Sequence, residues 1–172
     1  MLQNIFKIRR AFLIPFMAII FLLFFLLLLS IFKGQIREGA ILSVFFVVVL
    51  FIGIEMSRRE IVLTEDSLKI KKFFRVKEFV WAEITHLGIV ELRKKIYFLL
   101  TTTKGFYYFS NLAENHALLI RSLIDKLGDE KVEPEVKNYL ERPVERLSLI
   151  VMSWISVLVI IGIIILVVVS LN

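Results

Sequence analysis

Three long apolar runs constrain this chain more than any other feature. Ala11–Phe32 and Leu147–Leu171 contain no charged residue, and Ala40–Met56 contains only Glu55, near its end. As helices they would be about 33, 37 and 26 Å long, against about 30 Å for the hydrocarbon core of a bilayer. The composition agrees, since 58% of the residues are hydrophobic and the mean hydropathy is +0.82. We therefore predict three membrane-spanning helices.

The basic residues around these runs predict their orientation. Lys and Arg concentrate on the side that faces the cytoplasm. The head before the first run carries Lys7, Arg9 and Arg10, and many more basic residues lie between the second and third runs, whereas the loop between the first two runs has only Lys33 and Arg37. We expect the N-terminus and the central segment to be cytoplasmic and the C-terminus to be outside. No charge lies mid-membrane, so the runs are typical of an anchor and not of a pump or ion pathway.

The central segment, Glu60–Gly128, has the pattern of a small β domain. Short β-branched and aromatic stretches alternate with charged turns, as in antiparallel sheets joined by brief connections. In Leu68–Phe74, for example, Leu68 and Ile70 would point to one face while Lys69 and Lys71 point to the other. Six strands are expected: Glu60–Thr64, Leu68–Phe74, Lys77–Trp81, Thr85–Leu92, Ile96–Thr102 and Phe106–Ser110.

A helix is expected after these strands. Asn111 suits an N-cap, Glu114 stands three residues later as in a capping box, and Gly128 suits the end of the helix. The apolar residues of this stretch fall on one helical face, which must be buried against the sheet. They are Leu112, Leu119, Ile120, Leu123 and Leu127.

Three short patterns within the segment resemble those of the bacterial pleckstrin-homology-like (PH-like) domains. They are Leu63–Leu68, Val80–Ile84 and Thr103–Phe109, followed by the terminal helix. The resemblance covers roughly residues 59–127 and implies a bent antiparallel sheet or partly open barrel with a C-terminal helix over one end. It also implies a bacterial inner-membrane location and no enzymatic activity. The family has seven strands, one more than the six found here.

The expected fold class is therefore α+β: a cytoplasmic PH-like domain with three transmembrane α-helices. The predicted organisation is a transmembrane hairpin over residues 1–58, the PH-like domain over 59–128, a connector over 129–146 and a C-terminal transmembrane helix over 147–172. In the connector, Val132, Val136, Tyr139, Leu140 and Val144 recur at helical spacing. Two interpretations stay open, a helix lying on the bilayer surface and a plain charged linker.

Five basic residues crowd the second strand and the turn after it. They are Lys69, Lys71, Lys72, Arg75 and Lys77. In eukaryotic PH domains that bind phosphoinositides, an early loop rich in Lys and Arg holds the phosphates, and an anionic leaflet attracts each nearby cation by about 1 kcal/mol. We predict that these residues bind lipid headgroups; the alternative is a solvated strand face that discourages edge pairing. Arg93–Lys95 is a second, less specific basic turn.

Catalytic chemistry is not indicated. The chain has no cysteine, which excludes disulfides and thiolate sites. His86 and His116 lack metal-ligand spacing, and no nucleophile elbow or phosphate loop is present. We expect no catalytic residues, no metal, no cofactor and no nucleic-acid partner. Trp81, Phe106, Tyr107 and Tyr108 are expected in the core and at its rim.

Two functions fit these observations. In the first, the PH-like module does no chemistry and binds anionic lipid headgroups or a protein partner, with homo-oligomers included. In the second, the chain is an accessory subunit of a membrane transport or envelope-assembly complex, and its spans are the contact surface.

Overall fold

The computed structural model describes residues 4–92, 95–143 and 147–170 of the 172-residue chain. The chain divides into two compact units. Residues Met1–Arg9 and Arg58–Arg146 belong to the first, which we call the β domain; Arg10–Ser57 and Leu147–Asn172 belong to the second, the helical unit.

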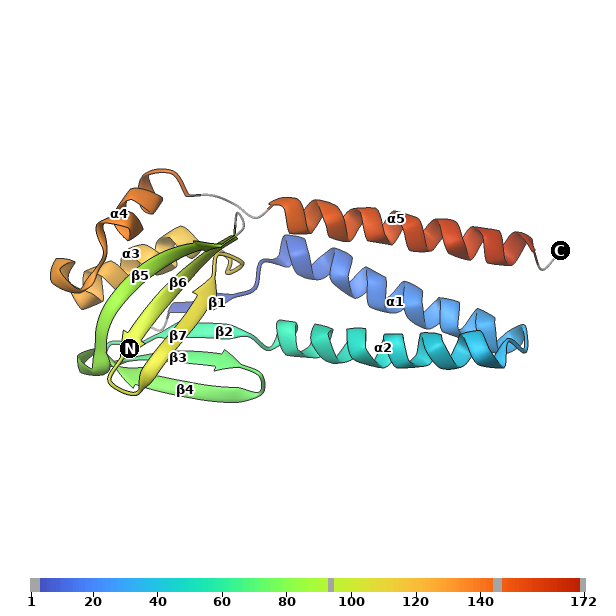
Figure 1. The fold of residues 1–172 in the computed structure, drawn as a ribbon, viewed down its shortest axis with the longest axis horizontal. Coiled ribbons are helices and arrows are strands. Elements are labelled where there is room, and N and C mark those ends of the chain that lie inside the picture. The colour runs from blue at the N-terminus through green and yellow to red at the C-terminus, as the bar shows by residue number, and fades with distance from the viewer. Residues whose placement is uncertain (1–3, 93–94, 144–146, 171–172) are drawn as a thin grey trace. The chain divides into compact units, whose positions relative to one another are not determined.

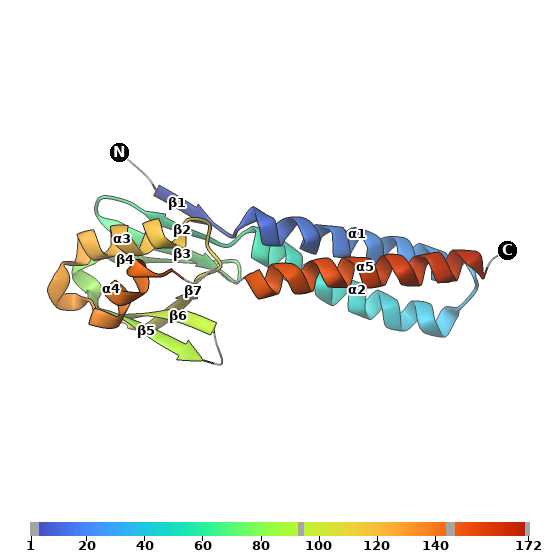
Figure 2. The same ribbon diagram turned by 90° about the horizontal axis from the view of Figure 1, so that it is seen from above.

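The helical unit contains the three predicted spans. They are α1 (Arg10–Phe32), α2 (Ile36–Ser57) and α5 (Leu147–Val169), each long and apolar enough to cross a membrane. Helix α1 forms an antiparallel hairpin with α2 and also packs against α5 (Figure 2). Gly53 makes the hairpin contact close, because a Cβ at this position would lie 2.5 Å from Cδ1 of Ile20. Small residues serve membrane helices in this way, since they let two backbones approach.

The first sheet of the β domain contains a strand that the sequence did not predict. The order is β1-β2-β3-β4, all antiparallel, with β1 (Asn4–Lys7), β2 (Glu60–Leu63), β3 (Ser67–Lys72) and β4 (Arg75–Val80). Strand β1 comes from the N-terminal head, and Lys7 pairs directly with Glu60. The α1–α2 hairpin is thus inserted between two paired strands. The boundary at residue 59 lies within one residue of the observed one, but the assignment of the N-terminal head to the hairpin separates β1 from its sheet.

The second sheet follows through a single 3-10 turn, η1 (Trp81–Glu83). Its strands are β5 (Ile84–Leu92), β6 (Lys95–Thr102) and β7 (Gly105–Ser110), antiparallel in that order. They run across the direction of β2–β4 (Figure 1). At the corner the indole Nε1 of Trp81 donates a hydrogen bond of 2.9 Å to the carbonyl of Glu65. Both sheets are antiparallel, as predicted, and the described residues form seven strands instead of six.

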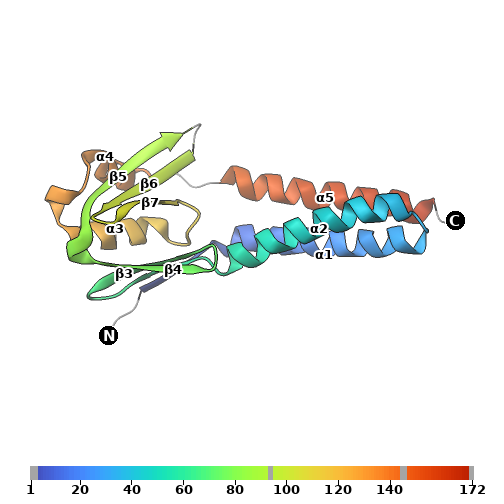
Figure 3. The same cartoon turned by 60° about the horizontal axis from the view of Figure 1, so that its bottom comes forward.

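Helix α3 (His116–Leu127) has the predicted buried face and a different start. Leu119, Ile120 and Leu123 are fully buried in one core cluster with residues of both sheets, and Figure 3 shows α3 between the sheets. The predicted cap at Asn111 is wrong. The backbone before the helix instead pairs with the end of β1, where Arg9 N–H donates to Leu112 O at 3.1 Å and Glu114 N–H donates to Lys7 O at 2.7 Å.

The connector after α3 is part of the β domain. It forms a 3-10 turn, η2 (Asp129–Lys131), and helix α4 (Pro134–Glu141). Val136 is fully buried, and the ring centroid of Tyr139 lies 5.2 Å from that of Phe98. The segment is helical over α4, as its spacing predicted, so it is not a plain linker. Its apolar face packs into the protein core, which contradicts a helix lying on the bilayer surface. Val144 lies outside the described residues.

Glu133 joins α4 to β5. Its backbone N–H donates to Leu87 O at 3.0 Å, and its carboxylate accepts the Ile89 N–H at 3.1 Å and shares a 2.9 Å hydrogen bond with His86 Nε2. Gly88 leaves room for this, since a Cβ there would lie 2.7 Å from Oε2 of Glu133. The bond to His86, followed by that to Ile89, holds the pKa of Glu133 below its ordinary value.

This pKa direction predicts a pH-dependent contribution to stability. A lowered folded-state pKa stabilises the fold above the unfolded value of about 4.3, and the contribution is lost as the pH falls through the folded-state pKa. Glu133→Gln should therefore cost about 1 kcal/mol at neutral pH, since the carboxylate is partly exposed, and the cost should shrink below pH 4. Thermal unfolding at pH 7 and at acid pH measures it. The control is Glu135→Gln, at an exposed position in the first turn of α4. Equal pH dependence of stability for the two variants would contradict a lowered pKa of Glu133 in the folded protein.

Candidate functional site

The register of the β3–β4 hairpin sorts the five predicted basic residues onto two faces. Lys69 and Lys71 point away from the core, because their neighbours Leu68 and Ile70 are buried. Residues paired across two strands share a face, and Lys72 pairs with Arg75 while Ile70 pairs with Lys77. Lys72, Arg75 and Lys77 therefore share the face of Ile70.

The two outer lysines are neutralised. Lys69 Nζ lies 3.2 Å from Glu78 Oε1, and Lys71 Nζ lies 3.3 Å from Glu60 Oε1. Glu78 also accepts a hydrogen bond from Ser67 Oγ at 2.7 Å. This bond, followed by that to Lys69, lowers the pKa of Glu78. The outer face thus carries half-exposed lysines that are paired with carboxylates.

Two of the three inner cations, Lys72 and Lys77, contact tyrosine rings of β7. Lys72 Nζ is 4.1 Å from the ring centroid of Tyr108. Lys77 Nζ is 4.7 Å from the ring centroid of Tyr107 and donates a hydrogen bond of 2.9 Å to its hydroxyl. Cation–π contacts of this kind hold lysines without cancelling their charge. The contacts join the hairpin of the first sheet to the last strand of the second.

These residues line a cavity of about 440 Å³. We call it the basic cavity. A smaller cavity of about 120 Å³ shares Ile70, Lys72 and Tyr108 with it. No acidic side chain is among the described residues of the basic cavity, so its cations attract an anion without competition from within. Its lining residues are Ile70, Lys72, Phe73, Arg75, Lys77, Phe106, Tyr107 and Tyr108.

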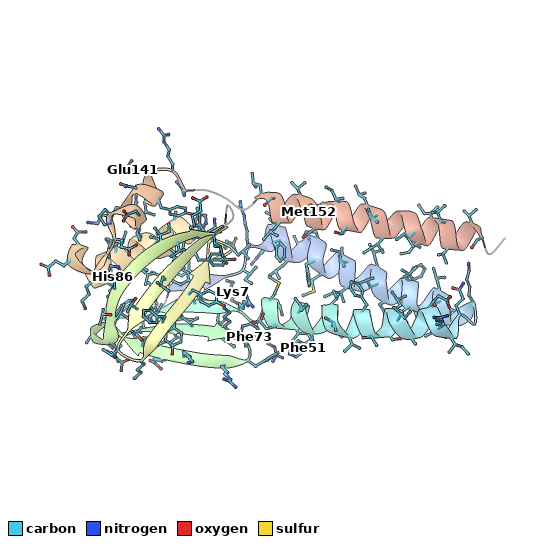
Figure 4. The ribbon with its side chains drawn as sticks, in the orientation of Figure 1. Lys7, Phe51, Phe73, His86, Glu141 and Met152 are labelled. Atoms are coloured by element: carbon cyan, nitrogen blue, oxygen red, sulfur yellow. The ribbon has the colours of Figure 1, made fainter. Side chains whose placement is uncertain are left out.

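The turn that joins β3 to β4 consists of Phe73 and Phe74, and Figure 4 labels Phe73 at this end of the hairpin. Both residues are left-handed, with φ of 52° and 57°. Two-residue hairpin turns of this kind favour Asn-Gly, and the left-handed conformation costs a bulky residue about 1–2 kcal/mol. The sequence prediction placed both residues in a strand, which is wrong, because Phe is a strand former and gives no turn signal.

Arginines from the start of the β domain cover this turn. The guanidinium of Arg58 lies 5.6 Å from the Phe74 ring centroid, and that of Arg59 lies 5.3 Å from the Phe73 ring centroid. Lys72 Nζ lies 5.3 Å from the same Phe73 ring. We call Phe73 and Phe74 together with Arg58 and Arg59 the aromatic tip.

The aromatic tip lies at the end of the sheet where the chain leaves and returns. Strand β1 ends at Lys7, three residues before α1 begins, and β2 begins at Glu60, three residues after α2 ends. Lys7 pairs with Glu60, and Glu60 pairs with Lys71, next to the turn. Three residues span at most about 10 Å. Lys7 and Glu60 are therefore each within about 10 Å of a helix terminus along the chain, whatever the orientation of the domain.

Comparison with known proteins does not assign the chain to a family. A scan of family models, a search of curated proteins and a search of solved structures each found no match. The site is therefore interpreted from its own geometry.

The other residues that the sequence singled out have structural contacts or lie outside the description. His86 pairs with Glu133, and His116 is buried with its ring centroid 5.9 Å from that of Tyr139. Within the part of the chain that the structure describes, no three His, Asp or Glu side chains gather as metal ligands. Arg93 and Lys94 of the second basic turn lie outside the described residues, and so does the side chain of Lys95.

Proposed function

We propose that this chain is a membrane-anchored binding module that does no chemistry. Its β domain is PH-like, faces the cytoplasm at a bacterial inner membrane, and takes the phosphate group of an anionic lipid into the basic cavity. The observation that carries this proposal is the convergence of Lys72, Arg75 and Lys77 on a cavity whose described lining has no acid. A phosphate oxygen is the partner that such cations and the nearby tyrosine hydroxyls suit best.

The number and order of the strands support the proposal that the β domain is PH-like. The seven antiparallel strands and the following helix among the described residues agree in number and order with the seven strands and C-terminal helix that the resemblance implies. The strand missing from the sequence analysis is β1, which precedes the membrane hairpin.

The pairing of β1 with β2 supports the orientation. A paired head and domain must lie on one side of any membrane that α1 and α2 cross. The basic residues of the head and of the domain then mark that side as cytoplasmic. The α5 helix, which follows the domain, leaves the C-terminus on the opposite side.

The test compares two double variants that each remove two positive charges from the β3–β4 hairpin. Lys72→Gln/Arg75→Gln alters the basic cavity, whereas Lys69→Gln/Lys71→Gln alters the outer face. The full chain is used, since β1 belongs to the domain. Binding of short-chain dihexanoyl phosphatidylglycerol and of inorganic phosphate is measured by calorimetry in uncharged detergent.

Loss of two cations worth about 1 kcal/mol each should weaken lipid binding by about 30-fold in the cavity variant. The outer-face variant should bind within about twofold of the unaltered chain, because its lysines are already paired. Binding of inorganic phosphate with equal affinity would assign the site to the free ion and not to the lipid. Equal losses in both double variants, or no binding of either probe, would overturn the proposal; in the second case an acidic protein segment becomes the ligand to test.

A further inference from the structure

The Phe73–Phe74 turn holds two bulky residues in a left-handed conformation that the sheet could form without them. An Asn-Gly pair would make the same two-residue turn without a Cβ penalty at the second position. The two rings are 60% and 49% exposed and belong to no part of the buried core cluster. Strain kept at an exposed position points to a role outside folding.

The surroundings of the turn indicate what the rings contact. Arg58 and Arg59 lie over them, and Lys72 and Arg75 flank the turn in the strands. Aromatic rings bordered by basic side chains match the membrane interface, where rings enter the headgroup level and cations meet phosphates. A soluble anion alone would not use the exposed rings.

The chain path supplies the second argument. The turn begins two residues after Lys71, whose partner Glu60 stands three residues after the end of α2. A bilayer that contains α2 therefore has its surface within a short covalent reach of the aromatic tip.

We propose that the aromatic tip is a second membrane contact: Phe73 and Phe74 insert their rings into the interfacial layer of the bilayer that α1 and α2 cross. The tip fixes the tilt of the β domain, so that the adjacent basic cavity opens toward the headgroups. The proposal rests on the membrane anchoring in the proposed function and not on headgroup binding in the cavity.

The absence of cysteine from the chain makes a site-specific probe available. Phe74→Cys and Thr103→Cys are each labelled with the environment-sensitive fluorophore NBD in the full chain, reconstituted into phosphatidylcholine vesicles with and without doxyl-labelled lipid. Thr103 is an exposed turn residue whose N–H donates to Glu83 O, beyond the opposite end of β4. Vesicles without anionic lipid separate this test from headgroup binding.

NBD at position 74 should emit at shorter wavelength than at position 103 and should lose emission in doxyl-labelled vesicles. Equal emission and equal quenching at both positions would overturn the proposal.

A second variant removes the rings without placing the label in the turn, which the label itself could distort. Phe73→Asn/Phe74→Gly keeps the turn type and should unfold at the same or a higher temperature than the unaltered chain. NBD at Val76→Cys, an exposed position of β4 near the turn, should be quenched by doxyl lipid in the native background and lose that quenching in the Asn-Gly background. Retained quenching in the Asn-Gly background would show that the rings do not hold the domain at the bilayer.

Discussion

Replacing Phe6 with alanine should lower the free energy of unfolding of the β domain by about 3–5 kcal/mol. Phe6 lies in the N-terminal head, which on sequence alone is a short basic segment before a membrane span. In the structure it is 5% exposed and belongs to the core cluster, while β1 pairs with β2 on one side and its continuation pairs with the segment before α3. Truncation leaves a cavity where the first sheet meets the core.

The neighbouring residue provides the control. Ile5 lies in the same strand but is 53% exposed, so Ile5→Ala should cost less than about 1 kcal/mol. Both variants keep the positive charges of the head, which leaves the topology signal unchanged. Resistance of the β domain to proteolysis, measured across a denaturant series on the full chain, gives the two stabilities. Equal stability of the Phe6 and Ile5 variants would mean that β1 adds nothing to the domain.

The three apolar helices and most of the strands could be predicted because their signals are local. Ala11–Phe32 and Leu147–Leu171 are each an uncharged apolar run long enough to cross a bilayer, and the alternation of Leu68, Lys69, Ile70 and Lys71 identifies a two-faced strand. The buried face of α3 follows from the same kind of pattern. None of these predictions needed a contact between distant parts of the chain.

Strand β1 could not be predicted because its partner is distant. Lys7 and Glu60 pair across the whole α1–α2 hairpin, and four residues followed by Arg9 and Arg10 carry no strand pattern of their own. The start of α3 was missed for a related reason. Asn111 and Glu114 have the spacing of a capping box, yet the backbone between them is used to pair with the end of β1.

The candidate site was predicted as a group of residues but not as an arrangement. Lys69, Lys71, Lys72, Arg75 and Lys77 form one basic cluster in the sequence. Their division into two paired lysines and three cavity cations depends on the register of β3 and β4, which the Phe73–Phe74 turn sets. Two phenylalanines give no turn signal, so the predicted strand ran through them and the register stayed undetermined.

Replacing Val136 with aspartate should lower the free energy of unfolding of the β domain by about 3–5 kcal/mol, the cost of an uncompensated buried charge. Val136 is fully buried on the face of α4 that packs against β5 and α3. Asn138→Asp, an exposed position of the same helix, introduces the same charge and should cost less than about 0.5 kcal/mol. Thermal unfolding of the full chain in uncharged detergent gives both values, and hydrogen exchange of residues 132–141 shows whether α4 has separated from the sheet. A helix resting on lipid would lose contact with the bilayer in the Val136 variant while the sheet kept its stability, so an unchanged unfolding temperature would contradict the packing of α4 into the core.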